Sequence, residues 1–273
     1  MNGFDVSKHN GSVDFNKAKA DGYDFVIIRA GFGKSNRDSY FDSNIRKALD
    51  AGLKVGVYWF LYGKTYNDII ANAKMAIATI GNYKDKITMG VWADYEYDSD
   101  RYVGRMLSTQ ERTSWVKAFC DYMINKGFDC GIYANPEYLD SKFGNLKAYK
   151  LWVARYTDNF DKVKNYNPYM WQYTSYGKVN GIKGNVDLNK IIATAPVQKP
   201  EPKPVQEVKK CYGIVTTKGS NLMLRSEANT KAKILKKIPN GKKVEILTKS
   251  NDWYKIVYEG ITGYGFSKYI KEI

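Results

Sequence analysis

Short apolar runs alternate with helical segments over the first 195 residues, and this alternation restricts the fold more than any other feature of the sequence. We expect eight strands, at residues 3–6, 24–30, 54–61, 88–95, 128–134, 149–156, 168–174 and 185–188. We expect five helices, at residues 14–21, 41–52, 66–82, 108–127 and 136–143. Nearly continuous apolar strands that alternate with helices are typical of a parallel sheet, and eight such strands can close into a barrel. The sequence therefore predicts an α/β fold, a trimmed (β/α) barrel whose last three strands lack helices between them.

A proline-rich stretch divides the chain. Residues 195–210, APVQKPEPKPVQEVKK, alternate proline with charged and polar residues and contain no aromatic residue, which is typical of an extended spacer. We therefore expect a barrel at 1–194, a linker at 195–210 and a small all-β domain at 211–273. Residues 1–195 carry 27 basic and 21 acidic side chains, whereas residues 196–273 carry 16 and 7, so the shorter part has the greater charge density.

Four acidic residues lie near the ends of expected strands. Asp5 closes the first strand, Asp94 and Glu96 the fourth, and Asp187 the eighth. Because the chemistry of (β/α) barrels lies at the carboxyl ends of their strands, we expect these four carboxyl groups to converge at one mouth.

The acidic run VWADYEYDSD also has two other interpretations. It can be a solvated turn, or the first half of a calcium loop, in which oxygen ligands alternate along the chain. A calcium loop requires glycine where this chain has Ser99 and glutamate where it has Arg105, so calcium binding is disfavoured. We expect Asp98 and Asp100 to lie on a solvated loop.

The composition disfavours several classes of site. The single histidine, His9, cannot supply the two or three imidazoles of a zinc hydrolase, and no G-x-S-x-G motif indicates a serine nucleophile. Cys120, Cys130 and Cys211 have no close spacing, so we expect three packing residues rather than a disulfide framework or a metal site. We expect no metal, no cofactor and no nucleic-acid partner, because no motif for any of them is present.

Membrane insertion and general export are also not indicated. No apolar run reaches the length of about 18 residues that spans a bilayer. The first residues, MNGFDV, do not have the basic and apolar regions of a secretory signal, so we expect synthesis in the cytoplasm without one.

Six segments of the first domain, taken in order, resemble glycoside hydrolase family 25, the Chalaropsis-type lysozymes, over about residues 1–192. They are GFDVSKHNGSVDF, AGLKVGVYWF, VWADYEYD, GIYANPEYL, LWVARY and MWQYTSYGKVNGIKGNVDLN. The resemblance implies an N-acetylmuramidase that cleaves the β-1,4 bond between N-acetylmuramic acid and N-acetylglucosamine of peptidoglycan. It also implies a barrel with five helices and three trailing strands.

The same resemblance suggests roles for the four acids. Glu96 is the expected general acid/base, and Asp94 orients the 2-acetamido group of the substrate, while Asp5 and Asp187 shape the charge of the cleft. A direct nucleophilic aspartate stays open as an alternative. Trp59 departs from the family pattern, in which many members have His or Tyr, and this departure leaves the sugar contacts there undefined.

Aromatic residues at strand ends are candidates for stacking on sugar rings. They are Tyr58, Tyr62, Tyr133, Trp152 and Trp171. Large side chains commonly fill barrel interiors, so Trp152 and Trp171 are weaker candidates than Tyr62 and Tyr133.

The segments LMLRSEAN, NGKKVEIL, DWYKIVY and GYGFSKYI resemble a bacterial SH3-like domain. Such domains commonly anchor hydrolases to cell walls, and the basic charge favours an anionic surface such as peptidoglycan or teichoic acid. The sequence thus predicts a wall hydrolase that acts at the bacterial cell wall, made as a bacteriophage endolysin or as a bacterial autolysin. A wall-binding lectin and a chitin-type glycosidase are the competing interpretations, and no oligomeric state is indicated.

Overall fold

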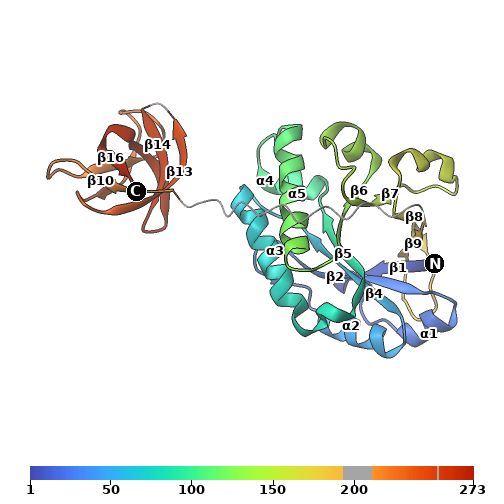
Figure 1. Ribbon diagram of the computed structural model, residues 1–273. Coiled ribbons are helices and arrows are strands. Elements are labelled where there is room, and N and C mark those ends of the chain that lie inside the picture. The colour runs from blue at the N-terminus through green and yellow to red at the C-terminus, as the bar shows by residue number, and fades with distance from the viewer. Residues whose placement is uncertain (193–210, 251) are drawn as a thin grey trace. The chain divides into compact units, whose positions relative to one another are not determined.

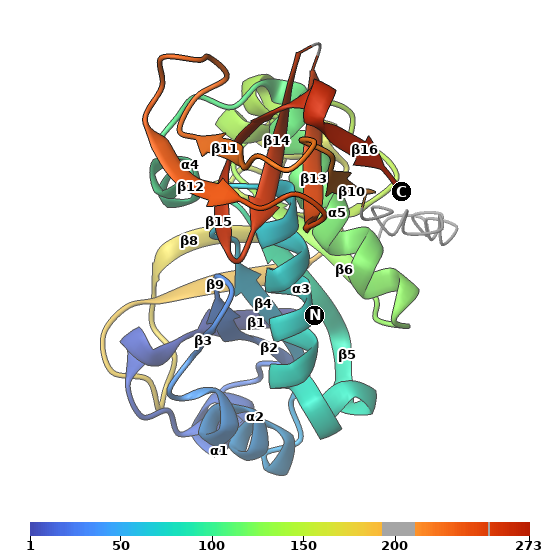
Figure 2. The same ribbon diagram turned by 90° about the vertical axis from the view of Figure 1, so that its left-hand side faces the viewer.

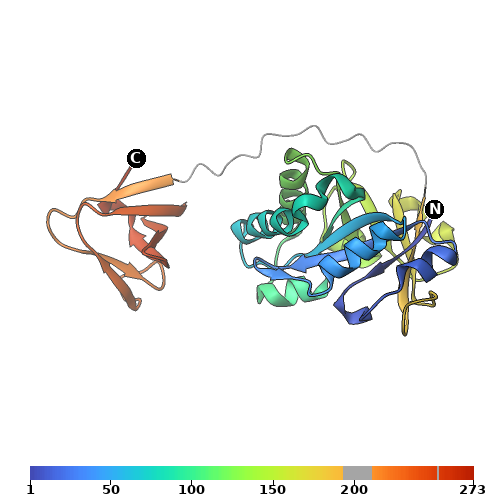
Figure 3. The same cartoon turned by 90° about the horizontal axis from the view of Figure 1, so that it is seen from below.

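The computed structural model describes residues 1–192, 211–250 and 252–273, so the expected linker lies outside the described residues. The chain divides into two compact units. The first is coloured blue to yellow and the second orange to red (Figure 1, Figure 3). Within the described part of the chain, no helix is long and apolar enough to cross a membrane.

Eight strands of the first unit form a closed barrel, as the sequence predicts. Each strand pairs with the next one around the barrel, and β1 pairs with both β2 and β9, which closes the sheet. The strands are β1 (Asn2–Val6), β2 (Phe25–Phe32), β4 (Lys54–Phe60), β5 (Ile87–Asp94), β6 (Cys130–Ala134), β7 (Lys150–Ala154), β8 (Met170–Gly177) and β9 (Val186–Ile191). A short strand, β3 (Asn36–Arg37), pairs with the end of β2.

The last strand differs in direction from the other seven. β9 runs antiparallel to both β8 and β1, whereas the remaining barrel pairs are parallel. An antiparallel strand begins at the edge where its parallel neighbours end. The first residues of β9 therefore lie at the mouth formed by the carboxyl ends of β1 and β8.

Helices cover the outside of the barrel, and α2 and α3 both contact β2 (Figure 2). The helices are α1 (Phe15–Ala20), α2 (Phe41–Asp50), α3 (Tyr66–Ile80), α4 (Tyr97–Val103) and α5 (Thr109–Asn125). Four of them match expected helices, but the fifth expected helix, at 136–143, is only a short π-helical turn, η3 (Tyr138–Lys142). Helix α4 was not expected; it ends at Gly104, which has the left-handed conformation (φ 73°) that favours glycine.

The remaining short helical turns lie in loops between these elements. They are η1 (Lys8–Asn10), η2 (Gly81–Lys86), η4 (Phe160–Lys162) and η5 (Lys164–Tyr166) in the first unit, and η6 (Ser267–Tyr269) in the second. The single histidine, His9, is exposed on η1.

Side chains alternate between the barrel lumen and the layer beneath the helices. The lumen below the mouth is filled by a cluster that includes Phe25, Ile27, Met89, Trp92, Trp152 and Met170. Trp59, on the opposite face of β4, packs in the outer layer, where its Nε1 donates a hydrogen bond to the carbonyl oxygen of Gly33 (3.0 Å). The departure from the family pattern at Trp59 therefore lies outside the lumen.

The second unit is a seven-stranded antiparallel sheet around its own core. Its strands are β10 (Cys211–Val215), β11 (Leu222–Arg225), β12 (Ile234–Ile238), β13 (Lys243–Ser250), β14 (Trp253–Tyr258), β15 (Ile261–Phe266) and β16 (Ile270–Glu272). They follow the order β12-β11-β15-β14-β13-β10-β16. The core contains nine buried residues, among them Leu224 and Ile256. This separate all-β sheet agrees with the predicted SH3-like domain.

The three cysteines are free. Cys120 and Cys130 are buried between α5 and β6 with their sulfur atoms 3.5 Å apart, as expected of packing residues. Cys211 is only partly buried and packs against the core of the second unit.

Candidate active site

The four predicted acids lie at one mouth of the barrel, on three different parts of the sheet. Asp5 on β1 is paired in register with Asp187, the second residue of β9. Asp94 is the last residue of β5, and Glu96 is the residue that precedes α4. Asp187 reaches the mouth because it begins an antiparallel strand, not because it closes a parallel one as expected.

Two buried amide side chains hold Asp5. Its Oδ2 accepts hydrogen bonds from Gln172 Nε2 (2.9 Å) and Asn189 Nδ2 (2.8 Å). The amides are themselves oriented, because Trp152 Nε1 donates to Asn189 Oδ1 (2.8 Å) and the Tyr133 hydroxyl donates to Gln172 Oε1 (3.0 Å). Each amide oxygen accepts a hydrogen bond from an aromatic side chain, so the NH2 group of each amide is directed toward the Asp5 carboxylate.

Neither amide was predicted from the sequence, although the position of Asn189 carried a signal. Asn189 lies two residues after Asp187, and alternate residues of a strand share a face. Gln172 stands within the quoted segment MWQYTSY, but an amide in a strand offers no signal of its own until the partner carboxylate is known.

The carboxyl groups of Asp94 and Glu96 lie close enough for a hydrogen bond between them, which raises the pKa of Asp94 and lowers that of Glu96. Asp94 is only 4% exposed, and its Oδ1 is buried without a hydrogen-bond partner among the described residues. The backbone N–H of Glu96 donates to Ser99 Oγ (3.2 Å) in the first turn of α4. Two carboxyl groups can share a hydrogen bond only when one of them holds a proton, so this pair retains a proton that isolated carboxyl groups would lose.

Burial raises the pKa of all four carboxyl groups. Repulsion from Asp187 adds to the increase in the pKa of Asp5, and repulsion from Glu96 adds to that of Asp94. The hydrogen bond from Asp94 offsets part of the increase in the pKa of Glu96, while the negative charge of Asp98 adds to it. Such paired carboxyl groups titrate together, and their raised pKa values suit them to donate and accept protons.

A buried arginine lies beside these acids on β2. Arg29 Nε donates to Asp38 Oδ2 (2.7 Å), with the two side chains 11% and 1% exposed. The same Asp38 oxygen accepts from the backbone N–H of Lys8 (3.1 Å), which ties the loop after β1 to this pair. The positive charge of Arg29 opposes the increase in the pKa of Asp94.

The five predicted aromatic residues have different positions. Tyr133 lies in the mouth, where burial and the negative charge of Glu96 raise the pKa of its hydroxyl. Tyr62 is partly exposed and its ring lies 5.0 Å from that of Tyr102 on α4. Tyr58 is partly buried in the lumen and packs edge-on to Trp152 (6.2 Å).

Two of the five, Trp152 and Trp171, are buried and pack against neighbouring side chains, so their contact with sugars stays a prediction. Trp152 is 2% exposed in the lumen beneath the acids. Trp171 is 4% exposed and packs with Val153 and Val163 in a separate cluster, while its Nε1 donates to the carbonyl oxygen of Arg155 (2.8 Å). Gln172, the next residue on β8, has the lumen position instead.

Asp98 and Asp100 lie on helix α4, not on a solvated loop, and their side chains diverge. Asp98 is 60% exposed and pairs with Arg101 (3.1 Å). Asp100 accepts hydrogen bonds from the hydroxyls of Tyr95 (2.7 Å) and Tyr138 (2.8 Å) and from Arg112 Nε (3.0 Å). Because the run of acids does not converge on one point, it does not form the disfavoured calcium loop.

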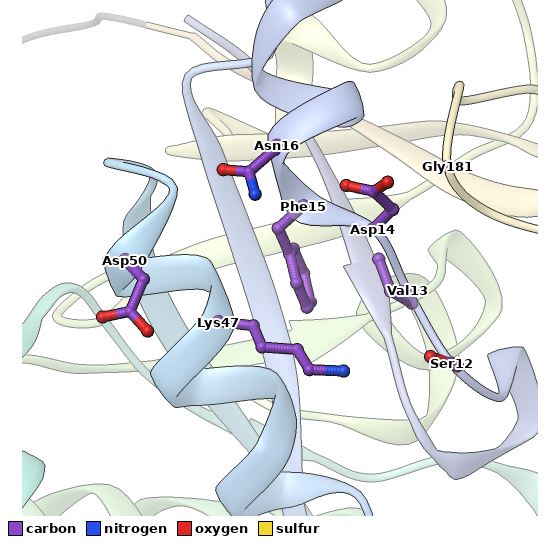
Figure 4. A pocket seen from close by; sticks show the side chains of 8 residues that line it. All are labelled: Ser12, Val13, Asp14, Phe15, Asn16, Lys47, Asp50 and Gly181. Carbon is purple, nitrogen blue, oxygen red and sulfur yellow. The ribbon is translucent and has the colours of Figure 1, made fainter.

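A separate hollow of about 480 Å³ opens between α1 and α2 (Figure 4). Lys47 of α2 extends there toward the segment that carries Ser12 and Val13 (Figure 4). The lining residues are Ser12, Val13, Asp14, Phe15, Asn16, Lys47, Asp50 and Gly181. None of the four acids lines it, so it is distinct from the acid-lined mouth.

Comparison with known proteins supports the assignment of both units. The family model described as glycosyl hydrolases family 25 matches residues 4–182, and the model of the bacterial SH3 domain matches residues 220–271. The N,O-diacetylmuramidase of Chalaropsis sp. is 30% identical over 211 residues, which cover 71% of this chain and 99% of that protein. The autolytic lysozyme of Clostridium acetobutylicum is 34% identical over 191 residues, which cover 69% of this chain. The match spans only 55% of that lysozyme's length.

Solved structures agree with these relatives. The bacterial lysozyme of Streptomyces coelicolor has a TM-score of 0.60 at 26% identity, over 71% of this chain and 93% of that chain. The CTP1L endolysin has a TM-score of 0.59 at 26% identity, over 70% and 66% of the two chains. The barrel, its acid-lined mouth and the family model lead to one conclusion: this chain belongs to the glycosyl hydrolases of family 25.

Proposed function

We propose that this protein is a muramidase that hydrolyses the β-1,4 bond between N-acetylmuramic acid and N-acetylglucosamine in peptidoglycan. The observation that carries the proposal is the convergence of Asp94 and Glu96 with Asp5 and Asp187 at one mouth of the barrel, where burial raises the pKa of each carboxyl group. Hydrolysis of a glycosidic bond requires a proton donor for the leaving oxygen and a group that stabilises the developing positive charge of the sugar. The similarity to N,O-diacetylmuramidases supports the choice of substrate.

In the proposed reaction Glu96 passes the proton of the Asp94–Glu96 pair to the glycosidic oxygen as the bond to the sugar breaks, which leaves both carboxyl groups ionised. The carbonyl oxygen of the substrate's 2-acetamido group attacks the same carbon and forms a cyclic intermediate. Glu96, now ionised, then accepts a proton from the water that opens this intermediate, so the configuration at the sugar carbon is retained.

The unpartnered oxygen of Asp94 supports the role of the acetamido group. A buried carboxylate oxygen without a donor is unfavourable, and the N–H of an acetamido group is a donor of the required kind. Asp5 differs, because its Oδ2 already accepts from Gln172 and Asn189. We therefore assign substrate orientation to Asp94, and to Asp5 and Asp187 the shaping of the charge in the cleft. A direct nucleophilic aspartate is the competing mechanism.

A wall-binding lectin is a weaker interpretation of the same site. Recognition of a sugar requires hydrogen bonds and apolar contacts, but it does not require a buried and a partly buried carboxyl group whose pKa values are both raised. We also propose that the protein acts at the bacterial cell wall, with the second unit binding peptidoglycan or teichoic acid. A bacteriophage endolysin and a bacterial autolysin both fit, since the similar proteins include an endolysin and an autolytic lysozyme.

The substitution Glu96→Gln tests this function. The amide keeps the shape of the side chain and cannot donate the proton, so turnover of purified peptidoglycan should fall by about 10²- to 10⁴-fold, with an unchanged circular dichroism spectrum. Mass spectrometry of the wild-type digest should show N-acetylmuramic acid at the new reducing ends. Turnover within tenfold of wild type, or N-acetylglucosamine at the new ends, would contradict the assignment.

A further inference from the structure

Strand β15 of the second unit has its large side chains on the outer face of the sheet and glycines on the core face. In the sequence ITGYGF, Gly263 and Gly265 face the core, because a Cβ at either position would lie 2.9 Å from Leu224 or Ile256, respectively. Alternate residues of a strand point to opposite faces, so Tyr264 and Phe266 point outward. This arrangement reverses the usual pattern of a strand that covers a core.

The register of the neighbouring strands adds three more residues to this outer face. Trp253 of β14 lies opposite Phe266, and Lys255 of β14 and Arg225 of β11 both lie opposite Tyr264. Residues that lie opposite each other in neighbouring strands share a face. Tyr264 is thus flanked by a cation on each side.

Three rings beside Tyr264 contact one another in sequence. The Trp253 and Phe266 centroids lie 5.3 Å apart, and those of Phe266 and Tyr269, on η6, lie 6.0 Å apart. Trp253, Tyr264 and Phe266 are partly exposed, and Tyr269 is 39% exposed. We call Trp253, Tyr264, Phe266 and Tyr269 the outer aromatic row. The core of this unit consists of nine other buried residues; Phe266 packs against it, whereas Trp253, Tyr264 and Tyr269 are not among the residues packed against it.

We propose that the outer aromatic row, with Lys255 and Arg225, is the surface through which the second unit binds the glycan strands of peptidoglycan. This inference rests on the proposed action at the cell wall. Aromatic side chains concentrated on an exposed surface are typical of binding sites, because they supply a large contact area with little loss of conformational freedom. N-acetylated sugars present flat apolar faces and acetyl methyl groups that such rings can cover.

The flanking charges fit the same partner. Lys255 and Arg225 can pair with the carboxylates of the lactyl groups and stem peptides that glycan strands carry. Residues 211–273 hold 12 basic and 5 acidic side chains, so the domain as a whole is attracted to an anionic wall. The phosphate backbone of a polymer such as teichoic acid is recognised by cations, and aromatic rings add no favourable contact with phosphate groups.

The test is co-sedimentation of the full chain, inactivated by Glu96→Gln, with purified walls from which teichoic acid has been removed. We expect Trp253→Ala and Tyr264→Ala each to weaken binding by about tenfold, the effect typical of a central interface residue. The matched control is Tyr212→Ala on β10, another partly exposed tyrosine, with Lys243 stacked over its ring (3.8 Å). This control should change binding by less than about twofold.

Folding and activity are measured on the same proteins. Each substitution removes an outward-facing ring, so the thermal unfolding of the second unit should stay cooperative. If Trp253→Ala unfolds without cooperativity, Trp253→Phe replaces it in the binding test and should retain most of the binding. In the chain with Glu96 intact, cleavage of soluble glycan strands should be unchanged by all three substitutions. Binding without cleavage would contradict the muramidase proposal alone, and cleavage without binding would contradict the present inference alone.

Four results would overturn the inference. The first is wild-type binding by both Trp253→Ala and Tyr264→Ala, and the second is an equal loss of binding in these variants and in Tyr212→Ala. The third is binding of the chain with an unsubstituted second unit only when teichoic acid is present. The fourth is displacement of this chain from stripped walls by a single-stranded oligonucleotide but not by soluble glycan. The third would assign the surface to a phosphate polymer, and the fourth would assign it to nucleic acid.

Discussion

Replacement of Asp100 by asparagine should destabilise the barrel, although Asp100 belongs to a run of acids that reads as a solvated loop. Its carboxylate accepts hydrogen bonds from Tyr95, Tyr138 and Arg112, which come from β5's end, η3 and α5. The Arg112 side chain is 8% exposed and that of Asp100 is 24% exposed. The substitution keeps one acceptor oxygen but removes the charge that balances a buried guanidinium.

The expected loss follows from these contacts. Breaking a buried ion pair by removal of one partner costs about 3–5 kcal/mol, and the partial exposure of Asp100 places this case at the lower end. Hydrogen bonds to charged groups are also stronger by about 1 kcal/mol than neutral ones, and three such bonds are weakened. We therefore expect Asp100→Asn to lower the free energy of unfolding by about 3 kcal/mol.

Urea unfolding followed by tryptophan fluorescence would measure this loss, because five of the six tryptophans lie in the barrel. With a urea dependence of about 3 kcal/mol per M, the midpoint should fall by about 1 M. Asp98→Asn is the matched control, since its ion pair with Arg101 is exposed on both sides and should contribute less than about 0.5 kcal/mol. Equal midpoints for Asp100→Asn and wild type would refute the role given to this network.

Two further predictions concern the acids of the mouth. Asp94→Asn should suppress turnover, yet it should raise the free energy of unfolding at pH 7 by about 1 kcal/mol. The pKa of Asp94 is higher in the folded protein than in the unfolded chain, so ionisation of Asp94 opposes folding as pH rises through that pKa, and asparagine removes this cost. A lower urea midpoint for this variant at pH 7 would contradict the argument. Turnover should fall as pH rises through the raised pKa of Glu96. The negative charge of Asp98 helps to raise that pKa, so Asp98→Asn should move the decline in turnover to lower pH, by a fraction of a pH unit at low salt. An unmoved pH–rate profile would show that Asp98 does not influence the general acid.

The barrel was predictable because its strands are apolar along most of their length. β2, β4 and β5 are buried on both faces, and such strands stand out in a sequence as continuous apolar runs. The direction of a strand is not visible in its own sequence in this way. The antiparallel course of β9 depends on the loop that precedes it and on pairing with β8 and β1, which are tertiary features.

Helix α4 shows why local patterns failed near the site. Residues 97–103, YDSDRYV, have acidic side chains at alternate positions, which suggests a turn or loop. The helix is instead fixed by contacts from elsewhere: Arg112 of α5 and Tyr138 of η3 both hold Asp100. A segment whose stability comes from distant partners cannot be assigned from its own residues.

The same reasoning separates the acids from the groups that support them. Carboxyl groups were recognisable because few acids stand at the ends of apolar strands, whereas Gln172 and Asn189 gain their importance only from lying against Asp5. Because of these amides, the pair formed by Asp5 and Asp187 differs chemically from the pair formed by Asp94 and Glu96. Asp5 has donors from the protein for its buried oxygen, whereas one oxygen of Asp94 has none among the described residues and is available to a donor on the substrate. This inequality favours Asp94, rather than Asp5, as the acid that orients the acetamido group.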